Sequence, residues 1–148
     1  NVQPHKAYSA GGKEALINGV QGSDSRYGDK EWLGFWGDDL EIKVDFLEET
    51  EVNMVTLRFY DANGQWIYAP EKVNLWIDLV DGRKVATSAL VDKDTISNIS
   101  TVRLIMPDTP IVITQNIKLE IPSYGLIPQG KQGAGNKAWT FIDEIIIE

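Results

Sequence analysis

The sequence predicts an all-β fold, an antiparallel β-sandwich or barrel. Apolar and polar residues alternate with a period of two in six separate segments, which is the pattern of strands that bury one face. Turn-forming residues lie between these segments, and no segment keeps the apolar spacing of a helix for more than a turn or two. Many short strands separated by turns are typical of sandwiches and barrels.

The six alternating segments are expected to be strands that each place one face on a core. In chain order they are residues 40–46, 55–59, 73–79, 102–106, 117–121 and 139–147. Asn63-Gly64 and Asp81-Gly82 are dipeptides typical of hairpin turns. In the last segment we expect one face to be shared by Trp139, Phe141, Asp143, Ile145 and Ile147.

Two long loops interrupt the strands, at residues 19–39 and 122–138. Both are rich in glycine and carry aromatic and charged side chains. Loops of this length are uncommon in a compact domain and are usually functional.

The composition excludes several classes of function. The 148 residues suffice for one domain with one core, and a net charge of −8 argues against a nucleic acid or an anionic membrane as partner. No apolar run approaches the ~18 residues of a membrane-spanning helix. Without cysteine there are no disulfides or thiol nucleophiles, and a single histidine leaves little room for histidine-based catalysis. Five tryptophans are many for this length and require an explanation.

The two ends of the sequence indicate a piece of a longer protein. The chain starts at Asn1 without the segments of a signal peptide, and it ends at Glu148 within what reads as a strand. We therefore expect residues 1–148 to be a single module, cut from the C-terminal end of a longer chain.

The first long loop and its flanks carry a family resemblance. The segments Ala15-Leu16-Ile17-Asn18-Gly19, Gly22-Ser23 and Trp32-Leu33-Gly34-Phe35 precede the strand Leu40-Glu41-Ile42-Lys43-Val44-Asp45-Phe46. This order resembles the start of a discoidin-like (coagulation factor 5/8 type C) domain.

The C-terminal segment carries a further resemblance. Residues 128–145, with the run Gly133-Ala134-Gly135-Asn136-Lys137-Ala138-Trp139, are similar to the C-terminal module of Bacteroides-type β-N-acetylhexosaminidases (chitobiases). Such modules are close to family 32 carbohydrate-binding modules. The resemblance spans nearly the whole chain. It implies a galactose-binding-like jelly-roll β-sandwich, a structural cation, and carbohydrate binding through loops at one end.

The resemblance implies a Ca²⁺ ion that joins the first loop to the last strand. The matching positions are Asn18, the loop from Gln21 to Ser23, and Glu144. The family commonly has Asp where this chain has Asn18, and a neutral amide oxygen should weaken the site. In the alternative interpretation, Asn18 only forms a turn and Glu144 only ends a strand.

For the carbohydrate site the resemblance implies aromatic rings that stack on a sugar, with polar partners nearby. Sequence context favours Trp36 and Tyr124 as exposed rings, whereas Trp32 is either a sugar platform or a plug at the sandwich end. Arg26 is the favoured polar partner and Asn136 is a further one. The alternatives are packing in the core or a loop for each ring, and a solvated surface charge for Arg26.

The remaining tryptophans and the histidine receive less weight as ligand contacts. We expect Trp139 and Trp76 to be structural, and Trp66 is ambiguous. Family members often place a loop histidine against the sugar, but the main loops here have none, and His5 is discounted because it lies near the N-terminus.

No catalytic constellation is evident, so the module is expected to be non-enzymatic. The carboxylate pairs available are Asp38-Asp39, Glu48-Glu49 and Asp143-Glu144. Glycoside hydrolysis needs two carboxyls flanking a cleft. Adjacent residues of a strand point to opposite faces, so these pairs are not expected to converge.

The leading hypothesis is a carbohydrate-binding accessory module of a glycosidase, a β-N-acetylhexosaminidase, with a hexosamine- or galactose-containing glycan as partner. Its chemistry would belong to an upstream catalytic domain in the same chain. We expect a secreted, periplasmic or cell-surface bacterial protein. The alternatives are a module that docks on and stabilises the catalytic domain without binding glycan, and a protein-adhesion domain.

Overall fold

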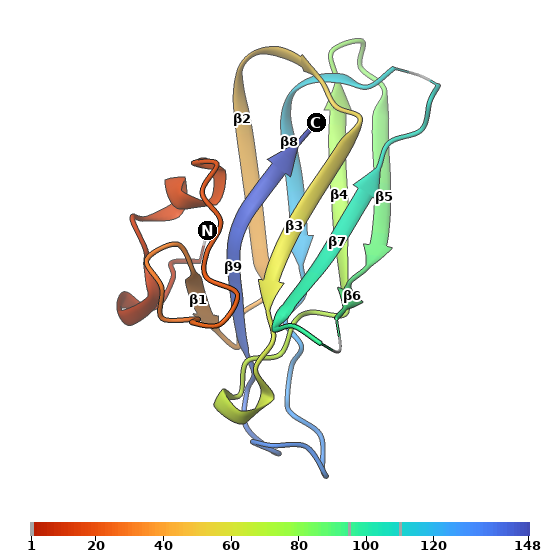
Figure 1. The fold of residues 1–148 in the computed structure, drawn as a ribbon. Helices are drawn as coiled ribbons and strands as arrows, with labels where there is room; N and C mark the ends of the chain where they lie inside the picture. The colour runs from red at the N-terminus through yellow and green to blue at the C-terminus, as the bar shows by residue number, and fades with distance from the viewer. Residues whose placement is uncertain (1, 95, 110) are drawn as a thin grey trace.

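The computed structural model describes residues 2–94, 96–109 and 111–148. Across these residues two antiparallel sheets pack face to face, which confirms the predicted β-sandwich (Figure 1). One sheet has the order β1-β9-β3-β7-β6 and the other has the order β2-β8-β4-β5. The strands are β1 Leu33–Trp36, β2 Leu40–Glu51, β3 Met54–Tyr60, β4 Lys72–Leu79, β5 Lys84–Leu90, β6 Asp92–Lys93, β7 Ile99–Ile105, β8 Ile113–Ile121 and β9 Trp139–Ile147.

All six predicted strands are present, and three further strands were not expected. The strand β1 lies inside the first predicted loop, where it pairs with the start of β9. The strands β5 and β6 lie at sheet edges and have few large apolar residues, so alternation in the sequence does not mark them. Edge strands bury less side-chain surface than central ones, and the periodic signal weakens accordingly.

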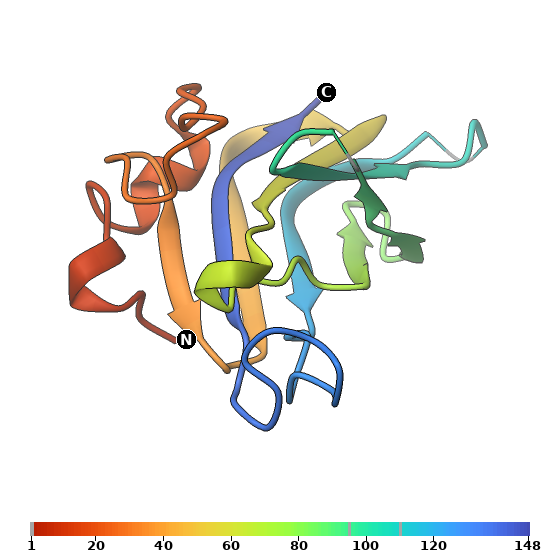
Figure 2. The same ribbon diagram turned by 60° about the horizontal axis from the view of Figure 1, so that its bottom comes forward.

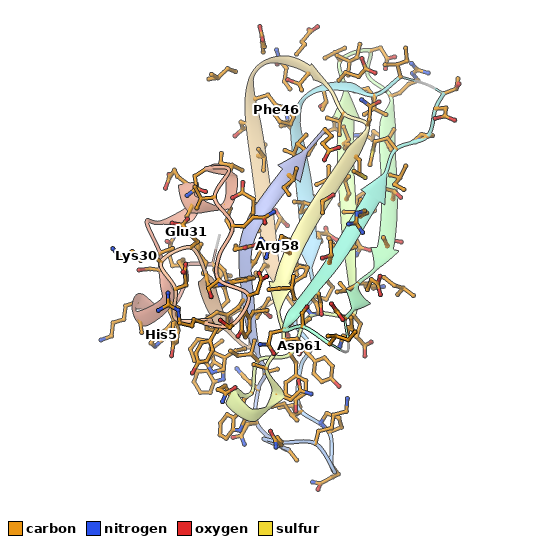
Figure 3. The ribbon with its side chains drawn as sticks, viewed as in Figure 1. His5, Lys30, Glu31, Phe46, Arg58 and Asp61 are labelled. Carbon is orange, nitrogen blue, oxygen red and sulfur yellow. The ribbon has the colours of Figure 1, made fainter. Side chains whose placement is uncertain are left out.

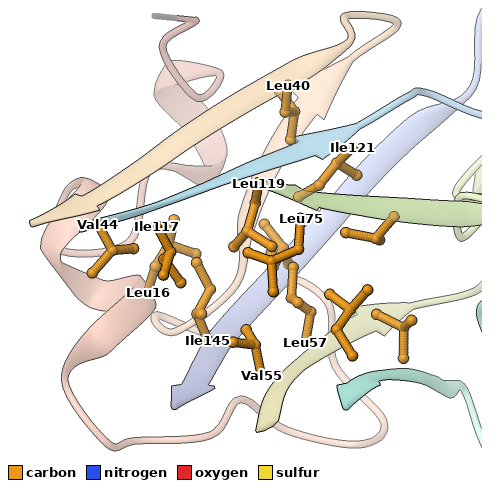
Figure 4. Close-up of a cluster of buried hydrophobic side chains, with 14 of the residues drawn as sticks. Leu16, Leu40, Val44, Val55, Leu57, Leu75, Ile117, Leu119, Ile121 and Ile145 are labelled. Carbon is orange, nitrogen blue, oxygen red and sulfur yellow. The ribbon is translucent and has the colours of Figure 1, made fainter. Parts of the chain in front are cut away.

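The main core lies between the sheets and consists of aliphatic side chains from both (Figure 4). Leu57 on β3, Leu75 on β4 and Leu119 on β8 are fully buried there. The alternation that predicted these strands is therefore the alternation between core and solvent.

A bulge in β9 changes which residues face this core. The register with β3 passes from Leu57 opposite Ile145 to Phe59 opposite Ile142, so β9 carries one extra residue. Ile142 and Ile145 consequently both lie in the main core, while Phe141 lies in a second cluster with Trp32 and Tyr60. The expectation that all odd positions from Trp139 to Ile147 share one face is therefore wrong beyond the bulge.

The N-terminal segment covers the β1–β9 side of the five-stranded sheet (Figure 2). It contains two 3₁₀ helices, η1 (Lys6–Tyr8) and η2 (Lys13–Ile17). A third, η3 (Asn63–Gln65), occupies the Asn63-Gly64 position, so this dipeptide forms a 3₁₀ turn and not a two-residue hairpin. Asp81-Gly82 does join β4 to β5, with Gly82 at φ 90°, a conformation that glycine adopts without strain.

The longer connections that follow β3, β5 and β8 gather at one end of the sandwich, at the bottom of Figure 1. They comprise residues 61–71, 91–94 with 96–98, and 122–138. We call this the loop end. The turn after β2 and the Asp81-Gly82 turn lie at the opposite end, with the C-terminus (Figure 1).

Among the described residues, no helix is long and apolar enough to cross a membrane.

Candidate functional site

The first loop is attached to β9 through two adjacent carboxylates. The Gly19 amide donates to Glu144 Oε1 at 3.0 Å, and the Gly22 amide donates to Asp143 Oδ2 at 2.7 Å. Both side chains reach the same loop because the extra residue in β9 breaks the strict alternation of the strand. The expectation that this pair points to opposite faces is therefore wrong.

Each of these carboxylates keeps one oxygen without a hydrogen bond. Asp143 Oδ1 and Glu144 Oε2 are buried and have no partner among the described residues. Burial raises the pKa of the Asp143 carboxyl, although the Gly22 amide and the Arg58 guanidinium oppose this. Burial also raises the pKa of Glu144, and the nearby charges of Asp143 and Glu31 add to the effect.

The predicted cation ligands lie close to this pair but are partly engaged elsewhere. Asn18 Oδ1 accepts from the Val20 amide at 2.8 Å, and Asn18 Nδ2 donates to Glu31 Oε2 at 2.9 Å. The Ser23 carbonyl accepts from Trp32 Nε1 at 3.0 Å. Gln21 is exposed.

Over the described part of the chain, no group of three or more His, Cys, Asp or Glu side chains has the arrangement of a metal site. A cation here would therefore depend on Glu144, on the Asn18 amide oxygen and on loop carbonyls. Glu31 approaches the same position, since it accepts from Asn18 Nδ2 and its charge acts on Glu144.

Arg58 joins the first loop to the five-stranded sheet and was not singled out from the sequence. Its side chain is only 9% exposed, with NH1 3.1 Å from Asp143 Oδ2 and NH2 3.2 Å from Asp24 Oδ1. Its guanidinium carbon lies 5.9 Å from the centre of the Trp32 ring. Figure 3 shows Arg58 over the sheet, on the side of Glu31 and the first loop. Arg58 occupies a polar position of a predicted strand, where a charged side chain is normally exposed. The sequence does not indicate that a distant loop covers it.

Trp32 is fully buried and cannot serve as a sugar platform. Its ring packs edge-on against Tyr60, with centroids 5.3 Å apart. Gly22 lies directly against it, since a Cβ at that position would be 2.3 Å from Trp32 Nε1. Of the two roles considered for Trp32, a sugar platform or a plug that packs at the end of the sandwich, the structure supports the plug.

Trp36 lies at the end of β1 and stacks on Trp139. The ring centroids are 6.0 Å apart and the planes differ by 21°. Trp36 remains 51% exposed, and its Nε1 donates to the Lys137 carbonyl at 3.2 Å. The indole is thus held in place on one face while half of its surface is in contact with solvent.

His5 lies beside this pair, although its sequence position led us to discount it. The His5 amide donates to the Gly34 carbonyl at 2.8 Å, which ties the N-terminal segment to β1. The His5 ring meets Trp139 edge-on, with centroids 5.4 Å apart. His5 Nδ1 accepts from the Ala7 amide, so a neutral imidazole carries its proton on Nε2. Trp139 is half-buried among these rings.

Tyr124 forms a second aromatic pair at the loop end, with Tyr68. Their centroids are 4.8 Å apart, and Lys131 Nζ donates to Tyr124 Oη at 3.1 Å. Lys93 and Lys131 place their ammonium groups 5.1 and 5.5 Å from the Tyr124 ring centre. Tyr124 therefore already has an aromatic ring and two cations as neighbours.

Among the described residues, no hydrogen bond joins Arg26 or Asn136 to Trp36 or Trp139. Arg26 is exposed and lines a hollow of the first loop together with Gln21, Asp29 and Glu31. Asn136 is exposed and donates through Nδ2 to the Gly133 carbonyl at 3.0 Å, which is a local turn contact.

Comparisons with known proteins show a likeness of fold to solved structures. A scan against protein-family models finds no match. A search of curated proteins also finds none. The lectin domain of Lectinolysin, solved with Lewis B antigen, aligns with a TM-score of 0.58 at 13% identity, covering 99% of this chain and 87% of that domain. A Streptococcus pneumoniae fucose-binding module aligns with a TM-score of 0.54 at 13% identity, covering 98% of this chain and 85% of the module. At this identity the likeness concerns the fold.

Proposed function

We propose that this chain is a non-catalytic carbohydrate-binding module that takes a sugar on Trp36 at the loop end. The observation that carries the proposal is an exposed indole stacked on Trp139 and tethered through its Nε1. A lectin domain and a fucose-binding module are solved structures with the same fold, which supports a sugar as ligand class.

The fixed position of Trp36 favours binding. A sugar presents an apolar C–H face that packs on an aromatic ring, and a ring that is already held loses little conformational freedom on binding. Trp139 covers one side of the indole, so the exposed side is available to the ligand.

His5 is the candidate polar partner for this ring. It lies on the same aromatic cluster, and its Nε2–H is free to donate to a hydroxyl once Nδ1 accepts from Ala7. Tyr124 is a weaker platform than Trp36, because Tyr68, Lys93 and Lys131 already surround it. Arg26 and Asn136 would contribute only to a ligand that extends beyond the ring.

We further propose a Ca²⁺ ion between the first loop and β9. The donors fit in kind, because Glu144 Oε2 is a buried oxygen without a partner among the described residues. Asn18 supplies an amide oxygen, and the amide of the next residue, Gly19, donates to Glu144. Gln21 and Ser23 would contribute backbone carbonyls. The ion would supply positive charge that keeps the buried carboxylates ionised and holds the loop on the sheet.

The wider setting is proposed on the sequence resemblance alone. It comprises a parent glycosidase with an upstream catalytic domain, a hexosamine- or galactose-containing glycan, and a location outside the bacterial cytoplasm.

A docking module remains a second candidate function because apolar side chains are exposed outside the loop end. Leu47 on β2 is fully exposed, and Ile105 and Ile111 are 68% and 60% exposed. Such residues favour a protein contact when they form a continuous patch.

Calorimetric titration with galactose, fucose, N-acetylglucosamine and N-acetylgalactosamine tests the proposed function. We expect binding of at least one sugar, and a loss of about tenfold in affinity with Trp36→Ala, the order of one aromatic contact. Leu126→Ala is the control, since Leu126 is an exposed apolar residue of the 122–138 loop and should not change the affinity. If no sugar of the panel binds, or if Trp36→Ala binds a sugar as tightly as the unaltered protein does, the docking module is favoured.

A further inference from the structure

The outer face of the four-stranded sheet carries a single exposed tryptophan. Trp76 on β4 is 45% exposed and points away from the core, since its neighbours Leu75 and Ile77 are buried. The expectation that Trp76 is structural does not fit this exposure. Lys118 Nζ lies 6.0 Å from the ring centroid. Burying an indole lowers the free energy, so an exposed tryptophan on a solvated sheet face indicates a surface that a ligand or partner covers.

The strand register places mostly polar residues around Trp76 on this face of the sheet. Lys118 on β8 and Ala86 on β5 lie directly opposite Trp76 on the two neighbouring strands. The small Ala86 side chain leaves the indole open on the β5 side. On the rows above and below, the same face presents amide, hydroxyl and carboxylate groups from Asn74, Ser88, Glu120, Asp78 and Asn116.

Trp76, Asp78, Asn116 and Lys118 line a groove of about 370 Å³ across the sheet, together with residues of the edge strands. Its lining comes from all four strands, with Lys43 on β2, Asn116 on β8, Trp76 on β4 and Lys84 on β5. Strands β2 and β5 are the two edges of this sheet. The groove therefore crosses about three strand spacings, roughly 14 Å, and reaches both edges.

The three lysines that line the groove are each paired with a carboxylate. Lys84 Nζ lies 2.7 Å from Asp78, Lys43 Nζ lies 3.4 Å from Asp45, and Lys118 Nζ lies 3.7 Å from Glu120. The face thus offers hydrogen-bonding groups without a large excess of either sign, which favours a neutral ligand.

We infer that this groove is a second carbohydrate-binding surface, which takes an internal unit of a neutral oligosaccharide with its pyranose ring stacked on Trp76. A protein interface would need a continuous apolar area, and here one aromatic ring stands among polar side chains. A ring flanked by hydroxyl-bonding groups matches the alternating apolar and polar surface of a sugar. Because the groove reaches both edge strands of the sheet, a chain can continue beyond the bound unit. The inference rests on the proposed function only for the ligand class, since the residues are different.

The test is a titration of ¹⁵N-labelled protein with neutral oligosaccharides of β-1,4-linked glucose, N-acetylglucosamine and mannose. We expect the indole N–H signal of Trp76 and the amide signals of residues 74–78 and 116–118 to shift with at least one series. Trp76→Ala should weaken that binding by about tenfold. Leu90→Ala is the matched control, because Leu90 is an exposed residue of β5 outside the groove lining.

The two sites are distinguished by measuring oligosaccharide binding in both variants, Trp36→Ala and Trp76→Ala. Binding that persists in Trp36→Ala and is weakened in Trp76→Ala supports the second surface, whatever the outcome at Trp36. If Trp76→Ala binds every oligosaccharide as the unaltered protein does, or if no series shifts the Trp76 indole signal at millimolar concentration, the inference is overturned. Trp76 is on the surface, so far-ultraviolet circular dichroism should confirm that the variant remains folded.

Discussion

Asp143 and Glu144 are consecutive residues of β9, and both accept hydrogen bonds from backbone amides of the same loop, Gly22 and Gly19. The bulge in β9 allows this, since it inserts one residue relative to β3. Two buried carboxylates thus hold a long loop on the sheet, and each keeps one oxygen that is unpaired within the described part of the chain. This arrangement makes the stability of the molecule sensitive to protons, to cations and to the bulk of the residues around it.

The first prediction concerns pH. The folded-state pKa values of Asp143 and Glu144 are raised, chiefly by burial, above unfolded values of about 4. Between those values the folded chain binds more protons than the unfolded chain. The metal-free free energy of unfolding should therefore rise as the pH falls from neutral toward the unfolded pKa values. Urea unfolding in the presence of a chelator measures it, and in Glu144→Gln this rise should be smaller. Parallel curves for the two proteins would contradict the prediction.

The second prediction concerns Ca²⁺. If the ion binds at Glu144 and Asn18, the melting temperature should rise with CaCl₂ and fall on chelation, because a ligand bound only by the native state stabilises it. At a hundredfold excess over Kd the gain is about 2.7 kcal/mol. Asn18→Asp should strengthen the effect by adding a carboxylate, and Glu144→Gln should weaken it. A melting temperature that changes neither with CaCl₂ nor with chelator would rule out the site.

The third prediction concerns Arg58. Replacing it with Ala leaves Asp143 buried without its counter-charge, which should cost about 3–5 kcal/mol of unfolding free energy. The loss should shrink at acid pH, where Asp143 is protonated, and in an Asp143→Asn background. Arg103, an exposed residue of neighbouring β7, is the control, and Arg103→Ala should stay within about 0.5 kcal/mol of the unaltered protein. Equal losses for the two arginines would show that the Asp143 pairing adds nothing.

The fourth prediction concerns the packing of the first loop on Trp32. A Cβ at Gly22 would lie 2.3 Å from the buried indole, so Gly22→Ala should destabilise the fold by about 1–3 kcal/mol. Gly28 is in the same loop and has no heavy atom within 4 Å of such a Cβ. Gly28→Ala should therefore have little effect in thermal unfolding. If Gly22→Ala is tolerated as well as Gly28→Ala, the loop must be less closely packed than the structure shows.

The central strands could be predicted because their alternation reflects burial against one core, as in residues 73–79 on β4. The strand β1 could not, since its four residues are almost all buried and carry no alternation. The bulge in β9 was equally hidden. Its residues look alternating, and only pairing with β3 reveals the extra residue.

Some features of the candidate site could be predicted from the sequence, and others could not. The exposure of Trp36 was inferred from its sequence context, and the structure agrees. The packing of Trp32 on Tyr60 and the approach of His5 to Trp139 are contacts between segments far apart in the chain. Local sequence carries no record of such contacts.

The sequence by itself determined that this is an antiparallel β protein, because period-two burial is a local property of each strand. It also supplied the carboxylates and aromatic rings that make a cation site and a sugar platform conceivable. Only the tertiary structure decided how these groups combine. The bulge turned Asp143 and Glu144 toward one loop, and the N-terminal segment brought His5 to Trp139. The register of β4 with β5 and β8 placed Trp76 in a polar groove. Each outcome depends on which distant strand or loop lies alongside, and that is set by packing of the whole chain.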